Sequence, residues 1–558
     1  MIGILLFLGI NFLCFLPTYI LNYKNQKQIL PFFLFSKTRL KDNLRILFLW
    51  KNSSDFFRIN FDFSILFLLT LYFDTPPLLL VVSSMSCVLG IITLGYSQFI
   101  TIFFERDISI LNDLTLAKTG LIILGKWRFL VILIFILVII LLYLCFESLI
   151  SILIIQEFNG PSLLVLYLFI CISGLYKIYD RPIEQYLMRT VISPIIILVK
   201  SYLSSLRENK FKGSGDFIKQ NQVKNYTLEK KPNIIVISVE SLGQILFKKN
   251  KFHNGIAPLL EVFNERLLQK KIKVAGSYSE SSIFAGGSWL AFTSFLCGLK
   301  IENEIEYTTV FKGAKHNEIQ SLPSFLEKNN YKNYYLNSIV VNLKRYKIDW
   351  KTLSKVFATK NFITHEQLNY TGKLLQFMSL RAIPDEYTLN YAFNKIKKNT
   401  PFFLFFPSLN SHFQWHSPLT IEKNWKDYNT LDFKTTKNSK NSSEDNYLKA
   451  ITYQYDYLTK FIADHADDNT VFVLFGDHQP PKITTKEMGK NTPLYIISKD
   501  EKFINSFHEE GFHNHLDLHH IKKMIKHEGF HTLFLKKLIK SYGVGHEDIK
   551  ILPDGIIP

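Results

Sequence analysis

Long apolar runs crowd the first third of this 558-residue chain, and segments of this kind are seldom left facing water. A helix needs about 20 apolar residues to cross a bilayer, and each of these runs is close to that length. They cover residues 1–21, 63–82, 85–104, 129–155 and 162–178. A cleaved signal peptide would explain only the first run. Residues 1–180 are therefore predicted to form a transmembrane bundle of about five helices.

Basic residues flank these runs, and their position decides how the net charge of +18 is interpreted. Lysines and arginines beside membrane spans contact lipid head groups, so the charge predicts a membrane partner and no nucleic acid. The basic residues between positions 24 and 58 would place that loop in the cytoplasm under the positive-inside rule. Five spans then leave the C-terminal half cytoplasmic, whereas a sixth span at 192–203, or a basic exterior loop, places it outside.

The five cysteines exclude an outer domain stapled by disulfides. Cys14, Cys87, Cys145 and Cys171 lie in predicted spans, so Cys297 stands alone in the second half. No Cys/His pair has the spacing of a zinc finger.

The chain changes character after residue 180. Residues 181–231 are a juxtamembrane segment that ends in a polar, glycine-containing linker. Short apolar runs then alternate with helical segments, which predicts an α/β layer sandwich at 232–500. Residues 501–558 are predicted to be a C-terminal extension of this second domain.

Four apolar runs are predicted to be buried strands of the sandwich, with helices between them at 321–329 and 387–397. NIIVISVES follows Pro232, PFFLFFPSLN lies within 400–410, VFVLFGDH lies within 470–478, and the fourth run covers 493–498. Ligands collect at the carboxyl ends of strands in such folds. Residues that directly follow the runs are therefore the first candidates for a site.

Glu240, Asp477 and His478 end or follow these predicted strands. A hard divalent cation takes oxygen and nitrogen ligands that converge from separate strands. One such residue by itself is most often an ordinary loop residue. Three of them at strand ends, each after a fully apolar run, predict a metal site.

The segment SIFAGGSWLAFTSFLCGLK at 282–300 places Gly286 and Gly287 before Ser288 and an apolar helix after it. Glycines let the backbone approach a phosphate closely, and the start of a helix presents N–H groups to the same anion. A cation beside Ser288 would lower the pKa of its hydroxyl and make it a nucleophile. Taken without the metal-site residues, the segment favours Ser288 as the N-cap of the helix.

These motifs resemble the sulfatase-like transferases of bacterial envelopes, in the alkaline phosphatase superfamily. That group holds the lipoteichoic acid synthases and the phosphoglycerol and phosphoethanolamine transferases. The resemblance covers roughly 233–496 and is carried by NIIVISVESLG, GGSWLAFTSFLCG, IPDEYTL, NSHFQWHSP and FGDHQPP. It implies one divalent cation, manganese, magnesium or zinc, bound by Glu240, Ser288, Asp477 and His478. It also implies that His412 contacts the donor phosphate, with His416 as a weaker candidate.

The sequence departs from the family pattern at two places. Ser288 is followed by WLAF instead of the C/S-x-P-x-R motif that yields formylglycine, which favours phosphoryl transfer over sulfate ester hydrolysis. The lone Cys297 favours a glycerol-phosphate-like enzyme over the disulfide-rich transferases that modify lipid A. Arg345 and Trp350 match the substrate-binding Trp/Arg pair of lipoteichoic acid synthases only loosely, and they are kept as candidates for binding substrate.

The resemblance therefore implies a membrane-anchored phosphotransferase. It would move phosphoglycerol or phosphoethanolamine from a phospholipid donor to an envelope glycan or lipid acceptor, through a covalent intermediate on Ser288. Its expected place is the bacterial plasma (inner) membrane, as a multi-pass protein with the catalytic domain facing the periplasm or exterior. A hydrolase of phosphate or sulfate esters is the first alternative. An inactive membrane scaffold is the second, and the presence of all four ligand-type residues disfavours it.

Histidines recur between His508 and His546, which leaves a second metal site as a further possibility. Lys522, Lys523 and Lys526 among them favour an ordinary solvated helix face instead.

Overall fold

The computed structural model describes most of the chain, and everything said below about its structure refers to those residues. They are 2–17, 59–72, 77–104, 106–123, 127–156, 160–161, 163–168, 170, 191–208, 226–313, 318–340, 350–377, 380–397, 401–416, 424–430, 432, 435, 442–522, 524–544 and 549–558. The chain divides into two compact units, residues 1–102 with 106–208, and residues 103–105 with 209–558.

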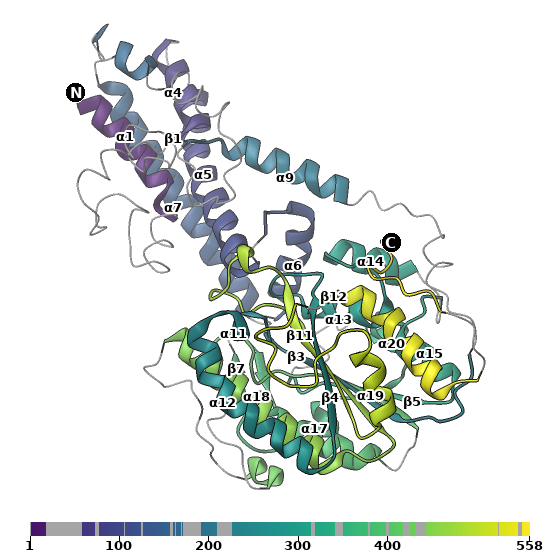
Figure 1. Ribbon diagram of the computed structural model, residues 1–558. Helices are drawn as coiled ribbons and strands as arrows, with labels where there is room; N and C mark the ends of the chain where they lie inside the picture. The colour runs from purple at the N-terminus through teal and green to yellow at the C-terminus, as the bar shows by residue number, and fades with distance from the viewer. Residues whose placement is uncertain are drawn as a thin grey trace. The chain divides into compact units, whose positions relative to one another are not determined.

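The N-terminal unit is built of apolar helices, drawn in purple and blue in Figure 1. They are α1 (Ile2–Cys14), α4 (Phe61–Tyr72), α5 (Pro77–Phe104), α6 (Ile110–Ile123), α7 (Arg128–Ile155) and α9 (Pro194–Glu208). Among the described helices, two are long and apolar enough to cross a membrane: residues 77–101 of α5, and α7. Within the most apolar window of α7, only 6% is buried inside the protein. A helix that is apolar all round and uncovered by protein is typical of contact with lipid.

The predicted boundary between the second and third apolar runs is wrong. A break was expected between residues 82 and 85, but α5 continues through this region, and the preceding helix α4 already ends at Tyr72. Pro77 explains where α5 begins, because proline is tolerated in the first turn of a helix and disfavoured further inside. Most of the fifth run and all of the basic loop at 24–58 lie outside the described residues.

The second unit contains a mixed sheet, which confirms the predicted α/β layer sandwich. The described strands form an eight-stranded sheet in the order β12-β4-β11-β10-β3-β9-β5-β6. Their bounds are β3 (Asn233–Val239), β4 (Lys273–Glu280), β5 (Lys332–Leu336), β6 (Asn361–Ile363), β9 (Phe402–Pro407), β10 (Thr470–Gly476), β11 (Asn491–Ser498) and β12 (Met524–Lys526). A separate antiparallel pair joins β7 (Leu375–Phe377) and β8 (Leu380–Ala382).

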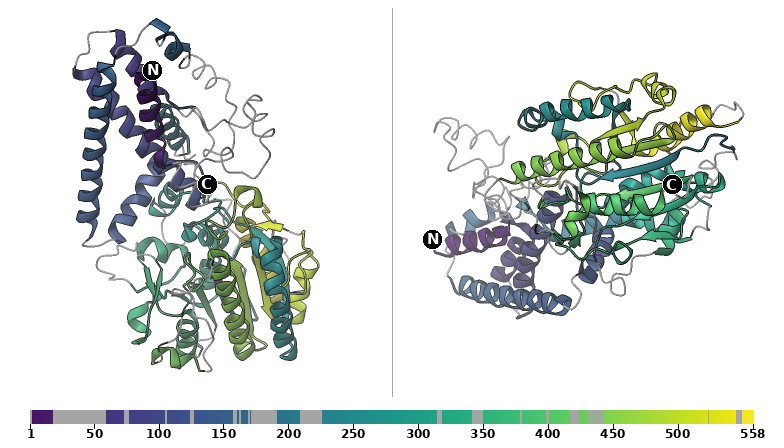
Figure 2. Two further views of the ribbon diagram at one scale, coloured as in Figure 1. Left: turned by 90° about the vertical axis from the view of Figure 1, so that its left-hand side faces the viewer. Right: turned by 90° about the horizontal axis from the view of Figure 1, so that it is seen from below.

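Helices cover both faces of this sheet, and the alternation of side chains along β3 divides the core in two. Ile235 and Ile237 pack under one helical layer, whereas Ile234 and Val236 pack under the other. The first layer holds α11 (Ile245–Lys248), α12 (Asn250–Gln269), α17 (Asp385–Ile396) and α18 (Ser443–His465). The second holds α13 (Ser288–Cys297), α14 (Glu304–Gly313), α15 (Leu322–Lys328), α16 (Trp350–Val356), α19 (Glu501–His508) and α20 (His527–Tyr542). Figure 2 shows α12 and α18 side by side in the first layer.

The four predicted strands and the two predicted helices are present, as β3, β9, β10, β11, α15 and α17. The fourth run differs in direction, because β11 is antiparallel to both of its neighbours. The interpretation of Lys522 and Lys526 as part of a solvated helix face is wrong. Lys522 lies in a loop, and Lys526 ends β12, which pairs with β4 before α20 begins.

Candidate active site

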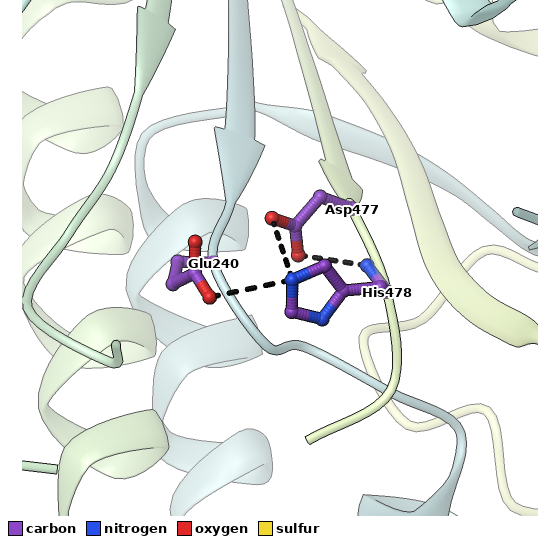
Figure 3. Close-up of side chains that lie close together, drawn as sticks. All are labelled: Glu240, Asp477 and His478. Carbon is purple, nitrogen blue, oxygen red and sulfur yellow. Dashed lines mark hydrogen bonds and ion pairs between the residues drawn. The ribbon is translucent and has the colours of Figure 1, made fainter. Parts of the chain in front are cut away.

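The carboxylates of Glu240 and Asp477 lie beside each other because of strand register. β3 and β10 are parallel neighbours, and Val239 at the end of one pairs with Gly476 at the end of the other. The next residue on each strand therefore emerges at the same edge of the sheet. Figure 3 shows both carboxylates turned toward the imidazole of His478, which follows Asp477.

These three side chains form a compact group of possible metal ligands. His478 Nε2 lies 3.5 Å from Glu240 Oε1 and 3.5 Å from Asp477 Oδ2. One ligand atom from each residue falls within 4.8 Å of the other two, and all three residues are buried. The described part of the chain holds no second group of this kind, so the histidines between 508 and 546 do not assemble a further metal site there.

Hydrogen bonds to neighbouring residues orient the three side chains. His478 Nδ1 lies 2.9 Å from the carbonyl oxygen of Gln479, so it carries the proton and leaves the Nε2 lone pair facing the carboxylates. Asp477 Oδ1 accepts from the backbone N–H of Ser241 at 2.8 Å and of His478 at 2.7 Å. The hydroxyl of Ser241 donates to Glu240 Oε1 at 2.9 Å.

The electrostatics of this group favour a bound cation. Burial, with the adjacent charge of Glu240, raises the pKa of Asp477 to about 7. Burial opposes protonation of His478, but Asp477 and Glu240 outweigh it and raise the pKa of the imidazole. Two carboxylates held close together away from water repel each other unless a positive charge lies between them. Two carboxylates and one imidazole nitrogen are a donor set that suits manganese, magnesium or zinc.

Ser288 joins the group from a third element. Gly286 and Gly287 have φ values of 66° and 73°, a left-handed conformation that glycine adopts at little cost. This turn places Ser288 as the first residue of α13, while Gly287 occupies the N-cap position. The Ser288 hydroxyl lies 3.3 Å from Glu240 Oε2 and 3.3 Å from His478 Nε2. Its oxygen therefore faces the metal-ligand group and does not cap the helix.

Among the proposed substrate-binding residues, the structure brings His412 near this centre. Its pKa is lowered by burial and by the neighbouring imidazole of His478. His412 Nδ1 lies 3.2 Å from the carbonyl oxygen of Phe413, and its ring packs 5.5 Å from that of Phe377. The ring of His416 stacks 6.3 Å from that of Phe377, and its Nδ1 is 2.7 Å from the carbonyl oxygen of Gln376.

The remaining two candidates cannot be placed at the site. Arg345 lies outside the described residues. Trp350 is the first residue of α16, and only its backbone is described.

The loop that carries His412 is held by polar residues to which the sequence assigned no function. Asp385 accepts hydrogen bonds from the backbone N–H groups of Leu409 and Asn410, each at 2.8 Å. Gln454 donates to Ser408 Oγ at 2.7 Å, and Ser408 Oγ accepts from the N–H of Glu240 at 3.2 Å. Asp385 was visible in the IPDEYTL motif, whereas Gln454 lies inside the long helix α18 and gave no signal.

Comparison with protein families matches residues 232–536 to the sulfatase family, over more than half of the chain. The chain belongs to the sulfatase family. Its sulfatase domain thus contains the metal-ligand group, Ser288 and the His412 loop, and it extends through most of the segment predicted to be a C-terminal extension.

Solved structures with likeness to the chain come from several bacteria. The lipoteichoic acid synthase LtaP from Listeria monocytogenes is 17% identical, with a TM-score of 0.39, over 60% of this chain and 79% of that one. The phosphoglycerol transferase GacH from Streptococcus pyogenes, in complex with sn-glycerol-1-phosphate, is 15% identical with a TM-score of 0.35, over 58% and 78%. An alkaline phosphatase superfamily protein from Vibrio parahaemolyticus is 13% identical with a TM-score of 0.36, over 58% and 74%. No curated protein matches the chain.

Proposed function

We propose that this sulfatase-family chain is a membrane-anchored, metal-dependent phosphotransferase. It moves the head group of a phospholipid, phosphoglycerol or phosphoethanolamine, onto a glycan or lipid of the bacterial envelope. The observation that carries the proposal is the position of Ser288, whose hydroxyl lies 3.3 Å from both Glu240 and His478. A serine placed this way is a nucleophile at a metal centre. Because Trp289 follows it instead of a formylglycine motif, a phosphoester is the expected product on this side chain.

Glu240, Asp477, His478 and Ser288 would hold the divalent cation. When bound, the cation supplies positive charge beside the serine oxygen and beside the oxygens of the donor phosphate. Ser288 attacks the phosphorus of the donor diester, a bond forms between its oxygen and phosphorus, and the bond to the diacylglycerol oxygen breaks. Ser288 is the first residue of α13, and the positive end of the helix dipole favours an anion there.

His412 is suited to move protons in both steps of the transfer. These are the attack of Ser288 on the donor and the attack of the acceptor hydroxyl on the phosphoserine. Its lowered pKa keeps the imidazole neutral at pH 7, and the Nδ1 proton is engaged by the Phe413 carbonyl. Nε2 then offers a lone pair that can take the proton of the acceptor hydroxyl as that hydroxyl attacks the phosphoserine. In the first step, the same nitrogen can take the proton that Ser288 loses and pass it to the oxygen of the departing diacylglycerol.

The membrane helices give this reaction its location. We place the chain in the plasma membrane through α5 and α7, with the sulfatase domain facing the periplasm or exterior. Anchoring holds the site within reach of lipid head groups, so the donor is present at high effective concentration without any further contact.

The test is mass spectrometry of the full chain in detergent, after incubation with manganese and either phosphatidylglycerol or phosphatidylethanolamine. We expect an adduct on the peptide that contains Ser288, with a mass that identifies the head group. Ser288→Ala should remove both the adduct and turnover while the protein stays folded. Ser294→Ala is the matched control, because Ser294 lies in the same helix but its hydroxyl bonds to the Ile301 carbonyl at 3.3 Å. Turnover that survives in Ser288→Ala, or release of free head group with no adduct, would contradict the proposed transferase and support a hydrolase instead.

A further inference from the structure

Helix α9 exposes a broad apolar face that the proposed chemistry does not use. Its six large apolar residues are each between 40% and 51% exposed: Ile195, Ile196, Val199, Tyr202, Leu203 and Leu206. At 3.6 residues per turn these positions project from one side of the helix. Lys200 and Ser204 are also exposed and form a polar strip beside this apolar face.

The opposite side of α9 is hydrogen-bonded to other residues of the N-terminal unit. The apolar face therefore points away from these residues. Ser201 Oγ donates to the Ile108 carbonyl at 2.9 Å, and Ser205 Oγ lies 3.0 Å from Ser109 Oγ. At the start of the helix, Asp62 Oδ2 accepts from the backbone N–H of Ile195 at 3.0 Å.

The length and polarity of α9 favour a position at the membrane surface over the sixth span that the sequence left open at 192–203. The helix has 15 residues, which at about 1.5 Å per residue gives roughly 22 Å, short of the roughly 30 Å of a bilayer's hydrocarbon core. Ser201 and Ser205 are buried against the segment before and within α6, where their hydroxyls find partners in protein.

We propose that α9 lies in the membrane–water interface, with its apolar face inserted among the head groups of an anionic phospholipid leaflet. The occupant of the face is lipid because the same unit contains α7, which is apolar along its length and almost uncovered by protein. Lys200 beside the apolar face suits anionic head groups, and the ring and hydroxyl of Tyr202 suit the boundary between acyl chain and water.

This inference rests on the membrane anchoring in the proposed function. It also sets where the segment between α9 and the sulfatase domain begins. The chain leaves α9 at Glu208 and enters the sulfatase domain at Asn233. An interfacial α9 therefore starts the connecting segment at head-group level, where the phosphodiester of the proposed donor lies.

The test uses the full chain without its native cysteines, reconstituted in vesicles of phosphatidylcholine and phosphatidylglycerol. A fluorescent label is attached to one introduced cysteine, at Val199→Cys or Leu203→Cys, and quenched by spin labels placed either high or low on the lipid acyl chains. We expect equal depth at both positions, with quenching by the high spin label at least about twofold stronger than by the low one. Lys200→Cys is the matched control and should be quenched much less.

Two results would overturn the interfacial placement. A label depth that changes steadily from Ile195→Cys to Leu206→Cys would show a helix that crosses the bilayer. Absence of quenching at both Val199→Cys and Leu203→Cys would show that protein, such as a second copy of this chain, covers the face. A label at Leu137→Cys on α7 tests the membrane anchoring by itself. If α7 spans the bilayer, the low spin label should quench this position wherever α9 lies. The Ser288 adduct is measured independently of all these labels.

Discussion

Asp385 shows how a single buried residue can act on the site without touching it. Its carboxylate is fully buried at the start of α17, and both of its oxygens accept backbone hydrogen bonds from the segment that leads to His412. Burial raises its pKa to about 7. Because the acceptor atoms come from a rigid helix, the loop after β9 has one favoured position relative to Glu240.

The substitution Asp385→Asn should lower kcat strongly and the free energy of unfolding only modestly. The amide keeps one acceptor oxygen, but its NH2 group replaces the oxygen that accepts from the N–H of Leu409 at 3.0 Å, which shifts the loop and His412. A displaced catalytic group costs on the order of tenfold to a hundredfold in rate. The measurement is kcat and KM for the lipid donor, and the expected loss is mainly in kcat, with about 1–3 kcal/mol lost in stability.

Glu386→Gln is the matched control for this prediction. Glu386 is the next residue and is also buried with its pKa raised to about 7 by burial, but its partners are Tyr453 Oη at 3.3 Å and Lys460 Nζ at 3.9 Å. It makes no hydrogen bond to the loop after β9 among those the structure describes. A comparable loss of stability with little loss of kcat is expected. Equal loss of kcat in both variants would mean that Asp385 acts only on folding.

At the scale of elements, the packing of α20 against α13 places two histidines in the core of the sulfatase domain. His527 lies 2.7 Å from Ser279 Oγ, and its ring meets Phe295 and Phe475 edge to face. His531 lies against Gly298, where a Cβ atom would come within 2.8 Å of its Nδ1. Burial lowers the pKa of His527 to about 3 and that of His531 to about 4.

Each of these two pKa values predicts a contribution to the free energy of unfolding that is lost in mild acid. In the folded state both groups stay neutral, whereas in the unfolded chain they bind protons below about pH 6.5. The contribution of the two histidines to the free energy of unfolding is therefore complete above that pH. It falls as the pH drops toward 4, by roughly 1.4 kcal/mol per pH unit for each group. Between pH 7.5 and pH 5, the melting temperature of His531→Gln should rise relative to that of the wild type, because the variant lacks one of the two destabilising protonations. His520→Gln, at an exposed position, should keep the wild-type slope, and an unchanged slope in His531→Gln would contradict the assignment.

At the scale of the whole molecule, the candidate metal centre joins parts of the chain that are far apart in sequence. Glu240 follows β3, Asp477 follows β10, and Ser288 begins α13. Because a cation there would bind only the folded arrangement, it should add about 2.7 kcal/mol of stability at a concentration one hundred times its dissociation constant.

Metal removal should therefore lower the melting temperature of the full chain and abolish turnover without unfolding it at room temperature. Manganese should restore both. Asp477→Asn provides the contrast, since it removes one of two mutually repelling carboxylates as well as a ligand. In EDTA this variant should melt no lower than the wild type, and manganese should not raise its melting temperature. A wild-type melting temperature that responds to neither EDTA nor manganese would contradict a metal at this position.

Much of the candidate site was predictable from local pattern. Apolar runs long enough for buried strands, each followed by a carboxylate or a histidine, predicted β3, β10 and the residues at their ends. This works because strand length, burial and the position of the last residue are properties of short segments. The roles of Ser288, His412 and the three ligands stay predictions, since geometry brings them together without showing their chemistry.

The amino-acid sequence by itself determined the apolar helices, the buried strands and the residues that follow them, because each depends on side chains close together in the chain. Only the tertiary structure decided that β11 runs antiparallel, that Asp385 holds the loop before His412, and which face of α9 is exposed among the described residues. Those features depend on hydrogen bonds and packing between segments far apart in sequence. No short stretch of residues contains both partners of such a contact, so no local pattern can reveal it.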